Sequence, residues 1–208
     1  MTPSASPATA TASGTSRPRL VIAITGASAP HLGIGLLRAL RHLGTVETHL
    51  VISGAAHRTI ELETGMTSGQ VADLADVVYK RHDIAASIAS GSFQTMGMVV
   101  APCSMKTLAG IAHGFSADLV TRAADVVLKE RRPLVLLPRE TPLSLIHLRN
   151  MVAVTEAGAT VLPPTPAFYQ RPTSIDDLLA HLTGKVLDQL GIEHDLYPRW
   201  QTPEGDAR

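Results

Sequence analysis

The stretch TRAADVVLKERRPLVLLPRETPLSLIHLRN, from Thr121 to Asn150, decides the fold class. It predicts a helix with one apolar face, ended by Pro133 after a basic cluster that suits the negative end of the helix dipole. Residues 134–137 (LVLL) are typical of a short buried strand in a parallel sheet. Thr141 and Pro142 then predict the start of another helix, with proline at its first position. This succession of elements indicates an α/β protein.

Arg139 and Glu140 follow the predicted buried strand directly. Ligands of open α/β sheets bind beyond the carboxyl ends of the strands, so this pair is well placed to meet an anion and to move a proton. Arg131 and Arg132 stand at the preceding helix end, where we expect them to be solvated instead.

Four more strands are predicted outward from this stretch, at 20–24, 46–52, 96–101 and 159–162, with helical patterns between them. Two of them feed turns that lead into a helix, TGASAPHLG at 25–33 and PCSMKT at 102–107. Such turns present backbone N–H groups to a phosphate, and two on neighbouring strands define one crevice. The full G-x-G-x-x-G fingerprint is absent from the sequence, which disfavours an ordinary NAD site.

Composition narrows the function classes. The 208 residues carry zero formal net charge and only 3% aromatic residues, which argues against a nucleic-acid surface. No apolar run is long enough for a membrane span. Cys103 is the single cysteine, which excludes an internal disulfide, suits the cytoplasm and predicts a small buried side chain rather than a nucleophile.

A single domain is predicted. Residues 1–18, rich in Ser, Thr, Ala and Pro, are expected to form a disordered extension without the apolar core of a secretory signal. Residues 19–192 form the folded domain. Residues 193–208 form a tail that contributes to the site or to a subunit contact, and this tail holds Trp200, the only tryptophan.

Four segments carry a resemblance to a known family: TGAS at 25–28, PCSMKTL at 102–108, RAADVVLKERRPLVLLPRETPLSLIHLRNM at 122–151 and PPTPAFYQRP at 163–172. The sequence resembles the UbiX family of flavin prenyltransferases. The resemblance implies a Rossmann-like, three-layer α/β/α fold with a parallel sheet. It also implies FMN bound at the subunit boundaries of a cytoplasmic homo-oligomer, commonly a dodecamer.

The chemistry that the resemblance implies needs no metal. A dimethylallyl group passes from dimethylallyl monophosphate to N5 of reduced FMN and then closes onto C6. The product, prenylated FMN, serves a partner decarboxylase of the UbiD type.

The resemblance also implies roles for particular residues. The FMN contacts would be Gly26, Ala27, Ser28, Ser53, Ser104, Met105, Lys106, Thr107 and Arg139. The prenyl phosphate would be held by Tyr169 and Lys185, with Arg122 and Lys129 added from a neighbouring subunit. Glu140 with Ser28 would relay the proton lost from the flavin, and Trp200 would help to exclude water.

The sequence departs from its relatives at three positions. Many relatives read G-A-S-G-A-x-Y-G in the first turn, whereas Ala29 and Leu32 stand here for the second glycine and the tyrosine. Lys185 stands where some relatives have arginine, which keeps the charge without the bidentate geometry. Two other functions stay open: an FMN-dependent decarboxylase acting on a peptidyl or pantothenoyl cysteine, and a non-catalytic flavin-binding protein.

Overall fold

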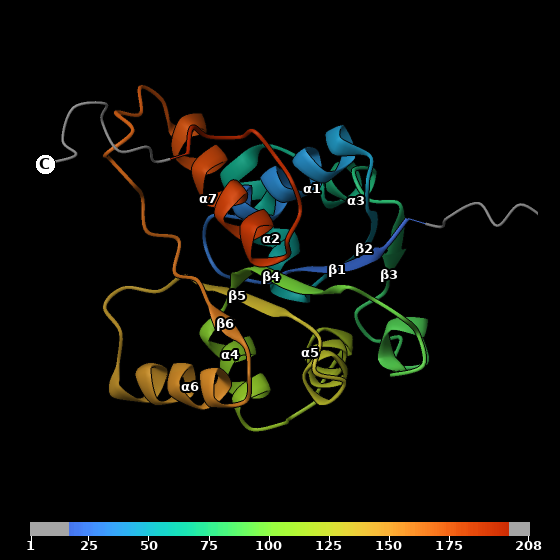
Figure 1. The fold of residues 1–208 in the computed structure, drawn as a ribbon. Helices are drawn as coiled ribbons and strands as arrows, with labels where there is room; N and C mark the ends of the chain where they lie inside the picture. The colour runs from blue at the N-terminus through green and yellow to red at the C-terminus, as the bar shows by residue number, and fades with distance from the viewer. Residues whose placement is uncertain (1–16, 200–208) are drawn as a thin grey trace, which may run out of the picture.

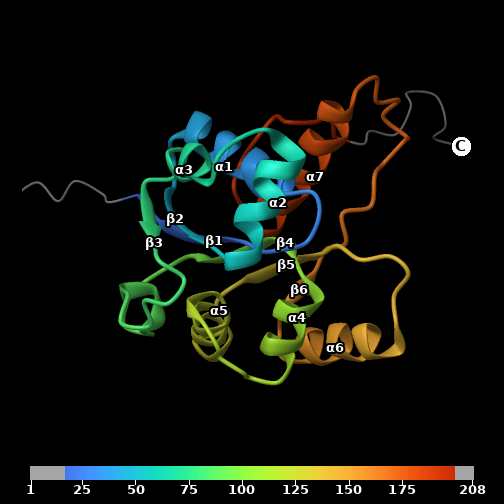
Figure 2. The same cartoon turned by 180° about the vertical axis from the view of Figure 1, so that it is seen from behind.

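The computed structural model describes residues 17–199 and shows three layers, with a parallel sheet between two sets of helices (Figure 1). The strands are β1 Arg19–Ile24, β2 Glu47–Ile52, β3 Val77–Tyr79, β4 Gly97–Cys103, β5 Leu134–Pro138 and β6 Thr160–Val161. The helices are α1 His31–Leu43, α2 Gly54–Thr64, α3 Ser68–Ala72, α4 Met105–Ala112, α5 Leu119–Lys129, α6 Leu145–Glu156 and α7 Ile175–Gln189, with a 3₁₀ turn η1 at Ser87–Ala89. Helices α1, α2, α3 and α7 cover one face and α4, α5 and α6 the other, as both views show (Figure 2).

The strand order is β3-β2-β1-β4-β5-β6, with every neighbouring pair parallel. This is the order of a Rossmann-like sheet, which confirms the predicted fold class. The chain winds outward from β1 to β3, then crosses back so that β4 pairs with the other side of β1. The crevice between β1 and β4 is therefore the switch point where such folds bind ligands.

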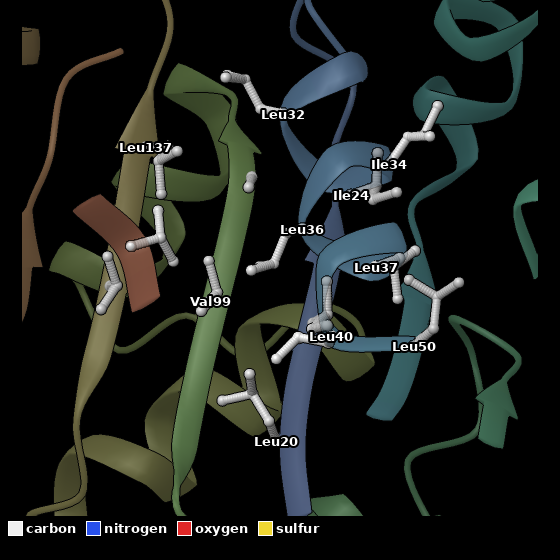
Figure 3. Packing of buried hydrophobic residues seen from close by; sticks show 14 of the residues in the cluster. Leu20, Ile24, Leu32, Ile34, Leu36, Leu37, Leu40, Leu50, Val99 and Leu137 are labelled. Carbon is white, nitrogen blue, oxygen red and sulfur yellow. The ribbon is translucent and has the colours of Figure 1, made fainter. Parts of the chain in front are cut away.

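Each central strand places alternate side chains in two separate cores, because successive residues of a strand point to opposite faces. In β1, Leu20, Ile22 and Ile24 pack with α1 and α7, whereas Val21 and Ala23 pack with α4 and α5. Figure 3 shows the first of these cores, with the leucines of α1 lying over β1, β2 and β4. Burial on both faces explains the nearly continuous apolar runs of these strands.

The helix after β5 begins at Leu145, so the prediction that Thr141 and Pro142 start it is wrong. Ser144 is the N-cap: its hydroxyl accepts from the backbone N–H of His147, whose ring accepts from the N–H of Ser144. This reciprocal cap satisfies two N–H groups that a helix start otherwise leaves unpaired, and it fixes the boundary.

Arg132 is also placed differently from the prediction, because its side chain is only 12% exposed. Its guanidinium donates to the backbone oxygens of Gly91 and Phe93, at 2.7 and 2.8 Å. Arg131, in contrast, is exposed as predicted. Arg132 therefore holds the loop before β4 against the end of α5.

The final helix begins after Ser174, whose hydroxyl accepts from the backbone N–H of Asp177. None of the helices between residues 17 and 199 is long and apolar enough to cross a bilayer. The predicted extension 1–18 lies almost wholly outside the described residues, and Trp200 lies outside them.

Candidate active site

A cavity of about 750 Å³ opens at the carboxyl ends of β1, β2 and β4. Its walls include five residues predicted to contact FMN: Gly26, Ser53, Ser104, Lys106 and Thr107. The volume lies in the range of cofactor and substrate sites. The structure thus joins three separate strand ends into one concave surface at the switch point of the sheet.

The floor of the cavity depends on a close approach between β1 and α2. A Cβ atom on Gly26 would lie 2.3 Å from the Cβ of Ala55, so no larger residue fits between them. Thr25 is fully buried, and its hydroxyl donates to the backbone oxygen of Pro102 at 2.7 Å while accepting from the N–H of Ser104 at 2.8 Å. These bonds tie the ends of β1 and β4 together.

The first turn of α4 forms one wall. Ser104 is its N-cap and accepts from the N–H of Thr107 at 3.3 Å, and the two hydroxyls lie 3.0 Å apart. Lys106 stands between them in sequence and lines the cavity. Met105 points the other way, toward the core beneath α4. The wall therefore offers hydroxyl groups, one ammonium group and the positive end of a helix dipole to an anion.

Ser53 occupies the corresponding position at α2, but its side chain makes no capping hydrogen bond. Next to it, a Cβ on Gly54 would lie 2.9 Å from the guanidinium carbon of Arg81. Arg81 thus lies across the start of α2 and lines the cavity together with His113. The sequence reasoning missed both residues. No sequence signal pointed to Arg81, because the strand before it, β3, was not predicted.

Ser28 and Ala29 follow Gly26 at the rim of the first turn. The Ser28 hydroxyl donates to Oε2 of Glu63 at 3.0 Å, and the backbone N–H of Ala29 donates to the same oxygen at 2.7 Å. Glu63 comes from the last turn of α2 and was not predicted, because nothing in the spacing of residue 63 relates it to residue 28. Ala27 is buried behind this turn. Ala29 has a φ of +69°, a conformation that favours the glycine of the relatives.

Arg139 and Glu140 lie just beyond β5 and both are exposed. The backbone N–H of Arg139 donates to the oxygen of Cys103 at 3.3 Å, which sets this strand end beside that of β4. The Glu140 carboxylate accepts from the N–H of Thr141 at 3.0 Å. The carboxylate found on the hydroxyl of Ser28 is that of Glu63, not that of Glu140.

Arg122 and Lys129 lie on α5 and neither lines the cavity. Arg122 donates to Asp125 at 2.7 Å and to the backbone oxygen of Ala89 at 3.2 Å. Lys129 pairs with Glu130 at 2.5 Å at the end of the helix. Since Thr121 does line the cavity, Lys129 is displaced from it by about 12 Å along the helix axis. Its own chain therefore does not bring it to this site.

Tyr169 and Lys185 form a separate group beside and on α7, on the other side of the sheet from α5 (Figures 1 and 2). The phenol oxygen of Tyr169 lies 3.1 Å from Nε2 of His181, and Lys185 lies 3.6 Å from Asp188. Both positions are outside the cavity wall of this chain. Within residues 17–199, no three His, Cys, Asp or Glu side chains gather as a metal site would require.

Cys103 is completely buried at the end of β4. Burial raises the pKa of its thiol to about 12. This confirms the predicted packing role, because a nucleophilic cysteine requires the thiolate form.

The sheet order and the cavity at its switch point define an α/β protein that binds a nucleotide-like ligand. The family model described as Flavoprotein matches residues 9–186. The flavin prenyltransferase UbiX of Escherichia coli K12 is 56% identical over 185 residues, which cover 88% of this chain and 98% of that protein. The chain belongs to the Flavoprotein family and, within it, to the UbiX-like flavin prenyltransferases.

Solved structures agree with this assignment. AnUbiX in complex with FMN and dimethylallyl pyrophosphate is 53% identical, with a TM-score of 0.88 over 90% of this chain and 99% of that one. A dodecameric FMN-dependent UbiX-like decarboxylase from Escherichia coli O157:H7 is 55% identical, with a TM-score of 0.87 over 88% and 100%. The peptidyl-cysteine decarboxylase EpiD is 15% identical with a TM-score of 0.59, a likeness of fold alone.

Proposed function

We propose that this chain transfers a dimethylallyl group from dimethylallyl monophosphate to N5 and C6 of reduced FMN, without a metal. The observation that carries the proposal is the cavity at the switch point, which gathers Gly26, Ser53, Ser104, Lys106 and Thr107. The likeness to AnUbiX, whose structure contains FMN and dimethylallyl pyrophosphate, supports it. The cysteine decarboxylase alternative has only a likeness of fold behind it.

The cavity suits a flavin nucleotide in both size and charge. Its volume of about 750 Å³ is large enough for a ring system, and the helix starts and cations in its walls suit a phosphate. Lys106 and Arg81 are the cationic side chains that would meet this phosphate. Reduced FMN, when bound, supplies the nucleophilic nitrogen of the reaction.

The donor phosphate needs a second set of cations and hydrogen-bond donors. We assign it to Tyr169 and Lys185, with Arg122 and Lys129 contributing where copies meet. As the carbon–oxygen bond breaks, negative charge grows on the departing phosphate, and fixed cations and O–H groups stabilise that charge. Holding the allyl carbon against the acceptor supplies an orientation term that reaches about 7–11 kcal/mol in well-aligned pairs.

Proton transfer from the acceptor needs a base beside the flavin. The hydroxyl–carboxylate pair of Ser28 and Glu63 has the connectivity of a relay, because Ser28 donates to a carboxylate that also accepts from the backbone. Glu140, at the end of β5, is assigned to the same proton path from the side of the donor. Ser28 would face the reacting atoms, and the two carboxylates would take up the proton.

Assembly of several copies would bring the cations that lie outside the cavity of their own chain to the cavity of a neighbouring copy. The outer face of α6 exposes Leu145, Ile146, Leu148 and Val152, by 59, 69, 45 and 57%. Such a patch is typical of an interface between subunits. With the dodecameric relative, it supports a homo-oligomer in which Arg122 and Lys129 serve the cavity of a neighbouring copy. The chain would act in the cytoplasm and pass its product to a UbiD-type decarboxylase.

The test is to reduce the bound FMN anaerobically, to add dimethylallyl monophosphate, and to measure the mass of the extracted flavin. We expect FMN heavier by one five-carbon unit. A parallel reaction with the diphosphate identifies the preferred donor. An unchanged flavin mass with both donors, while the bound FMN is demonstrably reduced, would refute the proposed function.

Two matched variants then assign the base. Glu63→Gln and Glu140→Gln each remove one negative charge while keeping size and hydrogen-bonding atoms. Both should retain FMN, measured by quenching of flavin fluorescence, and both should slow prenylation. Loss of FMN binding in either variant would contradict its assignment to the proton path.

A further inference from the structure

One face of α7 carries His181, Gly184, Lys185 and Asp188, at the i, i+3, i+4 and i+7 positions that align along a helix. The segment after α7 folds back onto this face. A Cβ on Gly184 would lie 2.5 Å from the ring of Tyr197, so the missing side chain creates the space that the ring occupies. Only glycine fits at position 184, because the ring of Tyr197 lies directly against the helix backbone there.

Asp188 fastens the returning segment. Its Oδ1 accepts from Arg199 at 2.6 Å and lies 3.1 Å from Nε2 of His194, and its Oδ2 accepts from the hydroxyl of Tyr197. Burial and the neighbouring carboxylate of Asp188 together raise the pKa of Tyr197 to about 12. This phenol therefore stays protonated and can donate. Tyr197 therefore holds a fixed place on α7.

His181 lies between this anchored ring and Tyr169. Its ring centroid is 4.7 Å from that of Tyr197, and its Nε2 is 3.1 Å from the hydroxyl oxygen of Tyr169. The residue is 7% exposed, and burial together with the charge of Lys185 lowers its pKa, which favours the neutral ring. The histidine is thus held from one side and bonded to Tyr169 on the other.

The unpaired nitrogen of His181 indicates which tautomer is present. Nδ1 is buried without a hydrogen-bond partner. A hydrogen on Nδ1 would therefore be an unsatisfied buried donor, so the favoured tautomer carries its hydrogen on Nε2. In that tautomer His181 donates and the oxygen of Tyr169 accepts, which orients the phenol and strengthens its own O–H as a donor.

The charges beside this pair favour an anion. Lys185 and Arg199 share the single carboxylate of Asp188, at 3.6 and 2.6 Å. Together, Lys185, Arg199 and Asp188 carry one excess positive charge. A phosphate oxygen that accepts from Tyr169 would therefore also be attracted by the ammonium group of Lys185.

We infer that His181 is a positioning residue for the donor phosphate: held by the Tyr197 ring and Asp188, it donates to Tyr169 and orients that phenol toward the anion neutralised by Lys185. This inference rests on the proposed function, since it assumes that Tyr169 and Lys185 meet the donor. Nothing in it requires His181 to touch the substrate.

The test compares His181→Phe, which keeps an aromatic ring but removes the N–H donor, with His181→Gln, which restores an N–H at similar reach. For His181→Phe we expect kcat/KM for dimethylallyl monophosphate to fall about tenfold, the size expected for one hydrogen bond. His181→Gln should recover most of this loss. The FMN dissociation constant should stay within about twofold in both. His42→Gln, at an exposed histidine near the end of α1, is the matched control and should behave as wild type.

A double-mutant cycle with Tyr169→Phe separates positioning from general weakening. If His181 acts through Tyr169, the double variant His181→Phe/Tyr169→Phe should be no slower than Tyr169→Phe alone. Additive losses, or a His181→Phe enzyme with wild-type kcat/KM, would overturn the inference while the wild-type enzyme still prenylates FMN. Failure of the wild-type enzyme to prenylate would instead refute the proposed function.

Discussion

Replacing Asp188 by asparagine should weaken the fold in a way that depends on pH. Burial raises the pKa of this carboxyl, but hydrogen bonds from Tyr197, Arg199 and His194 outweigh that effect and lower the pKa to about 2. The ordinary value is 3.8. A carboxylate with a depressed pKa in the folded state adds stability above the unfolded pKa, and loses it as the pH falls through the folded pKa.

The magnitude follows from the size of the shift. Each pKa unit corresponds to 1.36 kcal/mol, so a drop from 3.8 to about 2 is worth about 2 kcal/mol. The side chain of Asp188 is 19% exposed, so solvent screens this contribution only in part. The contribution is complete at pH 6, about half remains at pH 3, and nearly all is lost below pH 2.

The assay is urea unfolding of the wild-type protein and of Asp188→Asn at pH 6, 5, 4 and 3, at one fixed protein concentration because assembly adds to apparent stability. We expect a difference of about 2 kcal/mol in the free energy of unfolding at pH 6 that shrinks by about half at pH 3. A difference that stays constant over this range would show that Asp188 contributes through packing rather than charge. A larger difference at pH 3 than at pH 6 would reverse the sign of the argument.

Three further predictions concern backbone and assembly. Ala29→Gly should raise the melting temperature by about 1–2 °C, because relief of the positive φ exceeds the extra chain entropy of glycine; a lower melting temperature would contradict this. Gly33→Ala should lower the free energy of unfolding by about 1–3 kcal/mol, measured by urea titration, because its Cβ would lie 2.3 Å from the backbone oxygen of Ala101. Ile146→Asp should give a smaller particle in sedimentation velocity, because it charges the exposed face of α6; an unchanged particle would place the subunit interface elsewhere.

The sequence predicted the sheet well, and it predicted which strand ends lie together, because both depend on local patterns. Buried parallel strands are apolar runs, and the residues after them must meet at one edge, so Gly26, Ser53 and Ser104 could be placed together without coordinates. Lys106 and Thr107 followed because they open the helix after Ser104.

The remaining site residues depend on tertiary contacts that no spacing encodes. Glu63 reaches Ser28 from the far end of α2, and Arg81 reaches the start of α2 from a loop. His181 belongs to no recognisable motif, and its importance appears only when Tyr169 and Tyr197 are folded around it. The start of α6 was misplaced because a serine cap competed with a proline signal.

The complete burial of Cys103 has a consequence for handling a reduced flavin. Reduced flavins that react with air release peroxide, which converts accessible thiolates to sulfenic acids. Here the chain's single sulfhydryl, at the end of β4, is shielded and held in its protonated form. The protein can therefore hold an air-sensitive molecule beside its sheet without damage to its own sulfhydryl.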